Sequence, residues 1–317
     1  MIIPFFTDNH LRGNNSTNRI GNYYQDSIAK LKEILSIAKQ NKSPFILCGG
    51  DLIDSAIISL TICDEIIDLV EKNGIPIYTL VGNHPLFGHN WEVSHATTTA
   101  HIFRRTELIK KLDTLGGIPC FIEDDDVIIK GFDYSHDVEE SIKNDGLILG
   151  QETKKWKIAI THSFITPKPF LPQVLHVCVD DIKTDFDLVL MGHYHHPWSK
   201  IVEGVKFINP GCVGRLKIDE ADIEPSIVLL DTDKRETKIV KLKSAKPKEE
   251  VFDLKKIAEI KHFESDINKF IAELATTKFS ETDVLGMVKE IGKQKKIDKE
   301  VITEVENRII ALQGEEK

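Results

Sequence analysis

The sequence predicts a layered α/β domain followed by a helical C-terminal extension. Through the first two thirds of the 317 residues, short apolar runs alternate with segments of helical period, and further strands follow. From Leu254 onward the strand pattern ends, and apolar residues recur every three or four positions. Alternating strands and helices followed by strands are typical of a domain in which sheets and helices pack in layers.

Strands and helices alternate in the N-terminal part. The apolar runs at 2–6 (IIPFF), 45–51 (FILCGGD) and 75–84 (IPIYTLVGNH) predict strands. Residues 23–40 carry apolar side chains at three- and four-residue spacing, which predicts an amphipathic helix. We expect two further helices over 56–72 and about 94–113.

The middle of the chain is expected to be rich in strands. Strands or hairpins are predicted at 120–132, 157–163, 188–195, 205–211 and 225–243. Several of these runs end in histidine or another polar residue, as KIAITHS and LVLMGHYH do. Such endings mark the strand ends as the place to look for a site.

The chain is predicted to contain two domains. A layered domain covers residues 1–243, and a helical module covers 254–317. The segment 243–250 (KSAKPKEE) reads as a linker because it is charged, contains a proline and shows no periodicity. In the module, Ser280 and Asp283 resemble a capping box. Periodicity leaves open whether the module packs on its own domain or on a partner.

Composition excludes several classes of protein. Hydrophobic residues are 41% of the chain and charged residues 29%, which is ordinary for a globular protein. The five cysteines form no CxxC pair, which argues against a disulfide framework and a thiolate zinc site. No signal peptide or membrane segment is recognised, so we expect a cytoplasmic protein without a membrane partner. The net charge of −9 means that a polyanionic substrate would need a local positive centre, such as metal ions.

Five short clusters carry chemically capable side chains at the predicted strand ends. In chain order they are Asp8-Asn9-His10, Gly50-Asp51-Leu52-Ile53-Asp54, Gly82-Asn83-His84, Thr161-His162 and Gly192-His193-Tyr194-His195. The carboxyl ends of strands are where open α/β sheets place their sites. In Asp8-x-His10 and His193-x-His195 the two side chains leave an extended segment on the same face, so both can point into one site.

The donor set indicates a two-metal site. It comprises seven oxygen and nitrogen donors: Asp8, His10, Asp51, Asn83, His162, His193 and His195. Such donors suit Mn²⁺, Fe or Zn²⁺, and seven suit two ions that share a bridging carboxylate. Each cluster by itself is also typical of ordinary structure, such as a turn with a hydrogen-bonded histidine or an Asp that caps a helix. The five together, in this order, favour the metal site.

The same clusters resemble the calcineurin-like metallophosphoesterase superfamily over residues 1 to about 240. The resemblance implies a two-sheet β-sandwich flanked by helices. It assigns one metal to Asp8, His10, Asp51 and His195, with Asp51 bridging to a second metal held by Asn83, His162 and His193. It also implies that His84 contacts the scissile phosphate, together with Asn83, or protonates the leaving oxygen, and that Asp54 orients His84.

Within the superfamily the chain is similar to SbcD-type DNA repair exonucleases. Asn209-Pro210-Gly211 matches their Asn-Pro-Gly-Ser segment except for Cys212, and Pro85 stands where an acidic residue is usual. The resemblance implies a metal-dependent DNA exo/endonuclease with two divalent ions, Mn²⁺ first, and an SbcC-type ATPase partner, with a homodimer left open. The alternatives are a small-nucleotide phosphodiesterase or phosphatase, and a non-catalytic scaffold of the same fold.

Overall fold

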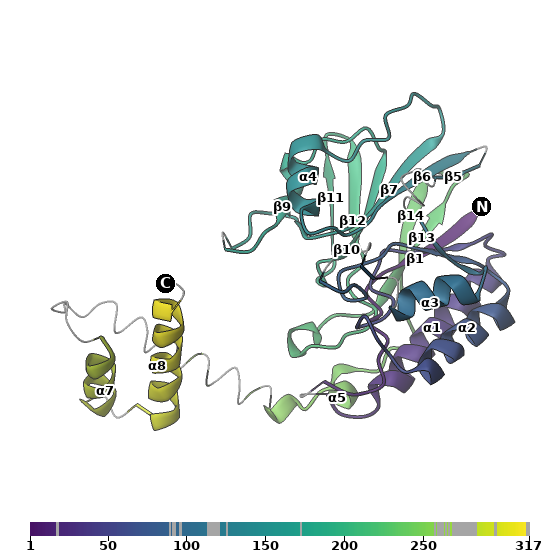
Figure 1. Ribbon diagram of the computed structural model, residues 1–317. Coiled ribbons are helices and arrows are strands. Elements are labelled where there is room, and N and C mark those ends of the chain that lie inside the picture. Colours follow the sequence, from purple (N-terminus) through teal and green to yellow (C-terminus); the bar gives the residue numbers. More distant parts are fainter. Residues whose placement is uncertain are drawn as a thin grey trace. The chain divides into compact units, whose positions relative to one another are not determined.

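The computed structural model describes most of the chain. The described residues are 1–16, 19–88, 90, 93–94, 97–112, 121–124, 126–171, 173–256, 258, 263, 265, 267, 284–294 and 297–314. The chain divides into two compact units, Met1–Val251 and Phe252–Lys317. The first unit contains both large sheets (Figure 1). All the predicted site residues lie within its range, Met1–Val251.

The first sheet has six strands among the described residues. Their order is β14 (Glu236–Lys241), β13 (Ser226–Asp231), β1 (Ile2–Phe6), β2 (Ile46–Cys48), β3 (Ile77–Thr79) and β4 (Ile109–Lys111). The last four are parallel, and β13 pairs antiparallel with both β1 and β14. The carboxyl ends of β1, β2 and β3 therefore meet at one edge of the sheet.

The second sheet also has six strands in the described part of the chain. Their order is β11 (Trp198–Val202), β12 (Val205–Asn209), β10 (Leu188–His193), β7 (Trp156–Ser163), β6 (Val127–Phe132) and β5 (Phe121–Glu123). The four central strands are parallel, and the two edge strands are antiparallel to their neighbours. A small pair, β8 (Ile165–Thr166) and β9 (Val177–Cys178), follows β7.

The two sheets pack face to face over an apolar core. Phe5 and Leu47 of the first sheet belong to the same buried cluster as Ile158 and Leu190 of the second. Helices α1 (Tyr23–Gln40), α2 (Leu60–Asn73) and α3 (Thr98–Arg105) cover the outer face of the first sheet, and α4 (Val138–Asp145) covers that of the second (Figure 1). The expected fold class, a two-sheet sandwich flanked by helices, is confirmed.

Local sequence explains where the outer helices begin and end. Asn22 precedes α1 and its side chain accepts a hydrogen bond from the backbone N–H of Gln25, which caps the helix. Ser59 caps α2 in the same way, and Gly74 ends it in the left-handed conformation. The helix expected over about 94–113 is shorter than predicted. It ends at Arg105, because the next residues extend and 109–111 pair with β3.

The second unit is described in part. Helices α7 (Val284–Gln294) and α8 (Lys299–Gly314) pack through a small cluster that includes Ile267, Val288 and Val305. The expected capping box at Ser280 and Asp283 lies outside the described residues. The predicted end of the first domain at 243 precedes the end of the first unit at Val251, because the short helix α5 (Lys248–Val251) belongs to that unit. Whether the helical unit is a functional module stays a prediction.

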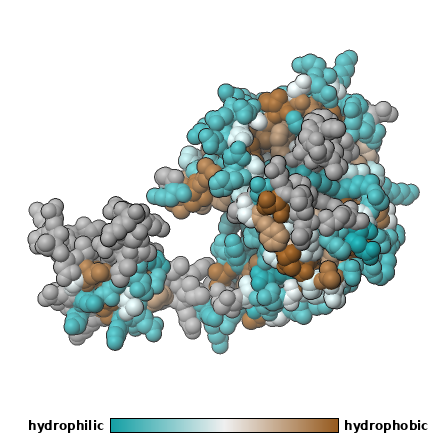
Figure 2. Space-filling model, in the orientation of Figure 1, coloured by the Kyte–Doolittle hydropathy of each residue, from teal (hydrophilic) through white to brown (hydrophobic). Residues whose placement is uncertain are grey.

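Two surface properties bear on function. No helix in the described ranges is long and apolar enough to cross a membrane. Apolar side chains gather on the loop between β8 and β9, where Phe170, Leu171 and Leu175 are 39–60% exposed, and Figure 2 shows this loop as a brown projection from the first unit. Exposed apolar groups in a cluster are a mark of binding surfaces.

We predict that the first unit folds by itself and needs α5 for its full stability. Val251 is fully buried and its carbonyl accepts a hydrogen bond from the Ile20 N–H at 2.9 Å. A chain ending at Asp253 should unfold in one cooperative transition. A chain ending at Lys248 should be less stable by about 3–6 kcal/mol, because it lacks the two buried side chains of Val251 and Phe252. Urea denaturation of both chains checks this, and equal midpoints would contradict it.

Candidate metal centre

The ends of five strands bring all seven predicted ligands together. Asp8, Asp51 and Asn83 follow β1, β2 and β3. His162 and His193 lie at the carboxyl ends of β7 and β10. Because His193 pairs with Ser163 across the neighbouring strands, the two histidines come from adjacent strands at the same edge. The predicted set therefore occupies one place in the fold, although its members span most of the first unit.

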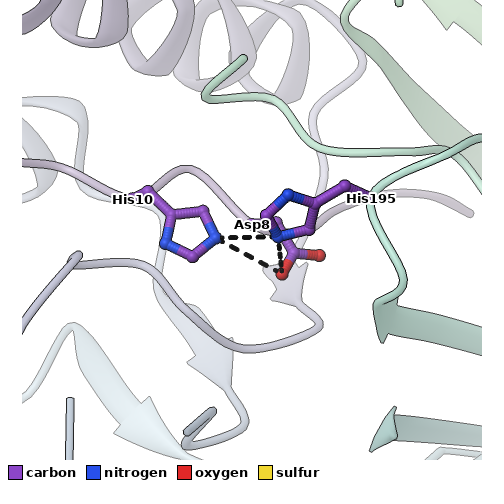
Figure 3. Close-up of side chains that lie close together, drawn as sticks. All are labelled: Asp8, His10 and His195. Atoms are coloured by element: carbon purple, nitrogen blue, oxygen red, sulfur yellow. Dashed lines mark hydrogen bonds and ion pairs between the residues drawn. The ribbon is translucent and has the colours of Figure 1, made fainter. Parts of the chain in front are cut away.

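One group of donors surrounds a point between Asp8, His10 and His195 (Figure 3). The Nε2 atoms of His10 and His195 are 3.1 Å apart, and Oδ1 of Asp8 lies 3.7 and 3.6 Å from them. Protein ligands lie about 2.0–2.2 Å from a metal such as Zn²⁺. Two donors of one ion are therefore separated by less than twice that distance, and all three separations here meet this limit. Three of the predicted ligands of the first metal thus lie together.

The second group contains Asp51, His162 and His193. Nε2 of His162 lies 3.4 Å from Oδ2 of Asp51 and 3.3 Å from Oδ1 of Asn83. The same Oδ2 of Asp51 is 3.8 Å from Nε2 of His10, which belongs to the first group. Asp51 thus stands between the two groups, as a bridging carboxylate would.

The backbone is held in unusual conformations at the site. Asp8, His10, Asp51 and His193 all have φ between 45° and 75°, a region that residues other than glycine seldom adopt. Backbone hydrogen bonds stabilise these conformations. The N–H groups of Asp8 and His10 donate to the carbonyls of Gly50 and Asp51 at 3.2 and 2.9 Å. Such strained residues cluster at functional sites, where the surrounding structure enforces them.

Glycine is required near the donors for two different reasons. Gly50 has a φ of 108°, as expected for a turn that exposes Asp51. Gly82 and Gly192 have no positive φ. A Cβ on Gly82 would overlap the carboxylate of Asp51, and one on Gly192 would overlap Thr7. Close packing of donors against backbone, and not a sharp turn, explains these two glycines.

Three of the four candidate ligand histidines, His10, His162 and His195, are oriented so that Nε2 faces the centre. Nδ1 of His162 donates to the carbonyl of Gly49 at 2.7 Å, and Nδ1 of His10 lies 3.1 Å from Oδ1 of Asp54. Nδ1 of His195 lies 2.5 Å from Oε1 of Glu220. A carbonyl or carboxylate at Nδ1 fixes the tautomer that leaves the Nε2 lone pair for a metal.

Charge is concentrated in this buried region. Burial by itself raises the pKa of the Asp8 carboxyl, but contacts with His10 and His195 lower it well below its usual value. Burial lowers the pKa of His10, but Asp54 and Asp8 raise it to about 10. Burial and the neighbouring His162 lower the pKa of His193 to about 3. The carboxylates therefore stay ionised and attract positive charge, while His193 stays neutral and can act as a ligand.

The residues present fit two divalent ions. No described residue donates a hydrogen bond to the buried Oδ2 of Asp51, the atom between the two groups, and buried polar atoms are seldom left without a partner. The donors are carboxylate, amide and imidazole groups, which suit Mn²⁺, Fe or Zn²⁺. Cys212 lies near His195 and Glu220, but burial raises the pKa of its thiol well above the usual value, so the thiolate form that binds metals is disfavoured.

His84 differs from the other histidines. Its side chain is 33% exposed, and its Nδ1 donates to the carbonyl of Asp54 at 3.0 Å. Its backbone N–H donates to Oδ1 of Asp51 at 3.1 Å. His84 also lies close to His10 and Asp51, so proximity does not exclude it as a ligand. Its predicted catalytic role stays a prediction.

Asp54 has a wider set of contacts than the sequence predicts. Its Oδ1 is 3.4 Å from Nδ1 of His84 but 3.1 Å from Nδ1 of His10, and its Oδ2 accepts from Arg12 at 2.8 Å. Contacts with His10 and His84 outweigh burial and lower the pKa of the Asp54 carboxyl. Asp54 therefore supports a candidate ligand as well as the predicted orientation of His84.

Glu220 is the main site residue that sequence reasoning missed. It is 1% exposed, and its Oε2 accepts hydrogen bonds from the backbone N–H groups of Leu216 and Lys217. Its Oε1 engages His195, as described above. Glu220 lies 25 residues beyond His195 in the sequence and belongs to none of the five clusters, so no spacing pattern pointed to it.

The Asn209-Pro210-Gly211 segment supports the backbone around the same histidine. The side-chain amide of Asn209 donates to the carbonyl of Tyr194, and its Oδ1 accepts from the N–H of Gly211 at 2.8 Å. The N–H of Cys212 donates to the carbonyl of His195 at 3.0 Å. The motif thus holds the backbone of the His193-x-His195 segment, and a small buried residue at 212 suffices.

A cavity of about 370 Å³ opens beside the centre. Asn83, His84, His193 and His195 line one part of it. His196, which was not expected to be a ligand, is absent from both donor groups but lines this cavity. A larger cavity of about 550 Å³ near Ile223 and Lys246 is lined by none of the predicted donors. Cavity volume alone therefore does not identify the candidate metal centre.

Comparison with known proteins identifies the family. Residues 1–197 match the calcineurin-like phosphoesterase family. The chain belongs to this family. Its members are metal-dependent hydrolases, which agrees with the donor clusters described above. Similarity to SbcD-type nucleases in particular is not shown by the match.

Solved structures give weaker similarities. An archaeal phosphodiesterase is 18% identical, with 76% of this chain and 100% of the other covered and a TM-score of 0.41. The protein TT1561 of Thermus thermophilus is 10% identical, with 76% and 98% covered and a TM-score of 0.43. No curated protein matches the chain. At these TM-scores the similarities carry no argument about substrate.

We predict that Glu220→Gln weakens metal binding at His195. The amide removes the negative charge from Nδ1, and changes of this kind cost about 10–100-fold in metal affinity. Calorimetric titration of the metal-free protein with Mn²⁺ measures the loss. Glu224→Gln is the control, because Glu224 is exposed and pairs with Lys241 away from the donors. Equal affinities in the two variants would rule out the role of Glu220.

Proposed function

We propose that this protein is a phosphodiesterase that cleaves DNA, as an exo- or endonuclease. The observation that carries the proposal is the position of Oδ2 of Asp51 between two donor groups, with the partly exposed His84 beside it. This arrangement suits two ions and a group that acts on the substrate. Asp8, His10, Asp51 and His195 would hold one ion, and Asp51, Asn83, His162 and His193 the other.

The ions supply the positive charge that the sequence lacks. When bound, two divalent ions lower the pKa of water and neutralise charge on the phosphate oxygens. The net charge of the chain is −9, so general attraction does not bring a polyanion to the site. Mn²⁺ is the first candidate, with Fe or Zn²⁺ as alternatives.

The protein's own groups position the substrate and move a proton. Because Nδ1 of His84 donates to the carbonyl of Asp54, its Nε2 is the atom that can hold a proton for the leaving oxygen. Asn83 lines the same open cavity as His84. A phosphodiester that enters the cavity would meet both side chains.

Two other functions stay in competition. A small-nucleotide phosphodiesterase or phosphatase would use the same donors, and the family match supports it equally. A non-catalytic scaffold is disfavoured because all seven donors and His84 are present and lie together. The preference for a phosphodiester or a phosphomonoester of the same alcohol separates a phosphodiesterase from a phosphatase, because the two substrates differ only in the number of ester bonds. A scaffold would hydrolyse neither.

We further propose that the helical unit binds an SbcC-type ATPase. Residues 252–317 carry 12 basic and 14 acidic side chains, which disfavours a purely electrostatic DNA arm. Amphipathic helices commonly bind in an apolar groove of a partner. The chain ending at Asp253 should cleave a small diester but lose co-purification with such an ATPase. Unchanged co-purification would refute this docking.

We predict that diesters are the preferred substrates. With Mn²⁺, the protein should hydrolyse bis-p-nitrophenyl phosphate faster than p-nitrophenyl phosphate and should shorten linear duplex DNA. Asp51→Asn should be inactive on all three, because both donor groups lose their shared carboxylate. A preference for the monoester would favour a phosphatase. Absence of turnover with saturating Mn²⁺ would favour the scaffold.

We predict that His84→Gln retains metal but loses turnover. His84 is outside the assigned ligand set, and loss of a general acid typically costs about 10²–10⁴-fold in kcat. Metal content is measured on the same samples as kcat for bis-p-nitrophenyl phosphate. A variant that loses metal would identify His84 as a ligand, and one with unchanged kcat would exclude the general acid.

A further inference from the structure

An aromatic wall lines the cavity next to the candidate metal centre. Phe164, Phe170, Tyr194 and His196 line it together with the donors named above. The ring centroids of Phe164 lie 5.5 and 5.2 Å from those of Phe170 and Tyr194, and those of Tyr194 and His196 are 5.5 Å apart. One continuous aromatic surface thus reaches from the loop between β8 and β9 to the His193-x-His195 segment.

The wall is not part of the apolar cores. Among the described residues, the buried clusters between and outside the sheets include none of Phe164, Phe170 and Tyr194. Phe170 is 39% exposed and lies on the apolar loop seen in Figure 2. Burying a phenylalanine side chain would stabilise the fold by about 1.5–3 kcal/mol, so the exposed Phe170 gives up part of this stabilisation where it is. The position of these rings makes sense if a ligand covers them.

We propose that this aromatic wall binds the nucleobase of a nucleotide whose phosphate lies at the metal centre. The proposal deepens the proposed function and rests on it for the position of the phosphate. Bases stack on aromatic side chains with about 1–3 kcal/mol per base, and every base offers such a face. A cavity of about 370 Å³ is at the small end of the roughly 300–1,000 Å³ range of ligand pockets. It suits one nucleoside better than a long segment of nucleic acid.

The remaining lining fits the same ligand. Lys217, Asp219 and Glu220 complete the lining of the cavity. Lys217 and Asp219 are exposed, whereas Glu220 is buried against His195. The exposed polar groups keep this side of the cavity in contact with water, where the sugar and the polar edge of a base can be solvated. Because ring faces supply most of the contact, the site selects for the presence of a base and hardly among bases. The base is supplied either by the end of a DNA strand or by a free nucleotide.

Phe170 is the residue that tests the wall. It is outside the ligand set, and the hydrogen bond that its backbone N–H donates to Nε2 of His176 at 3.1 Å does not need the ring. Phe170→Ala therefore removes one ring and leaves the loop its anchor. Phe170→Trp restores a ring. Leu171→Ala is the matched control, because Leu171 is the next residue on the loop, is 59% exposed and does not line the cavity.

The kinetic experiment uses two dinucleotides in Mn²⁺. One is thymidylyl-thymidine, and the other carries an abasic tetrahydrofuran in place of one nucleoside. The full protein should prefer the first by about 10-fold or more in kcat/KM, consistent with one stacked base. Phe170→Ala should lose most of this preference through KM, whereas Phe170→Trp and Leu171→Ala should keep it. Equal kcat/KM for the two dinucleotides, or a preference unchanged in Phe170→Ala, would overturn the proposal.

A binding experiment separates this proposal from the proposed function. A 2-aminopurine deoxynucleotide is titrated in EDTA, where stacking quenches its fluorescence and no turnover occurs. Quenching that is lost in Phe170→Ala, without hydrolysis of any diester in Mn²⁺, would leave the base site standing and refute the enzyme. Hydrolysis in Mn²⁺ with neither quenching nor base preference would leave the enzyme standing and refute the base site. A last comparison measures kcat/KM for thymidylyl-thymidine and for 2′,3′-cyclic AMP in the full protein and in Phe170→Ala. The substrate whose kcat/KM falls in Phe170→Ala tells whether a strand end or a free nucleotide supplies the base.

Discussion

The buried carboxylate of Asp51 is the constraint on which the site depends. It lies at the end of a central parallel strand, out of contact with water, and its Oδ2 faces imidazoles from both donor groups. A buried charge is tolerated only when opposite charge or hydrogen bonds compensate for it. The surrounding histidines supply part of that compensation as protons, and divalent ions would supply it more completely. Stability of the fold and affinity for metal are therefore linked at this side chain.

The rest of the first unit serves to hold these charges in place. The two sheets bring strand ends from distant parts of the chain to one edge, and glycines at 82 and 192 let donors pack directly against backbone. Left-handed residues at 8, 10, 51 and 193 aim side chains that a regular strand would send elsewhere. Outside the donors, Asp54, Glu220 and the Gly49 carbonyl fix the imidazole rings. The strain and the close packing are understandable as the cost of this convergence.

The site has two kinds of surface, and they suit different parts of a substrate. The donor groups are polar and almost completely buried, so they suit a small, highly charged group such as a phosphate. The aromatic wall is partly exposed and presents ring faces, so it suits a flat, weakly polar group. A nucleotide carries both kinds of group within one nucleoside's length. Phosphoserine and phosphothreonine side chains have no such flat group, so the wall would distinguish a nucleotide from them.

The sequence by itself determined the fold class and the set of residues that meet at the strand ends. Strand period and strand-end position do not depend on distant contacts, so the clusters from Asp8 to His195 could be recognised one by one and matched to a family. Only the tertiary structure brought in Glu220, which reaches His195 from a short 3₁₀ helix 25 residues further on. It also gave Asp54 its contact with His10 and placed Phe164 and Phe170 beside Tyr194. These contacts join residues that are far apart in the sequence. Such contacts arise from the packing of the folded chain and produce no local spacing pattern, so the sequence did not predict them.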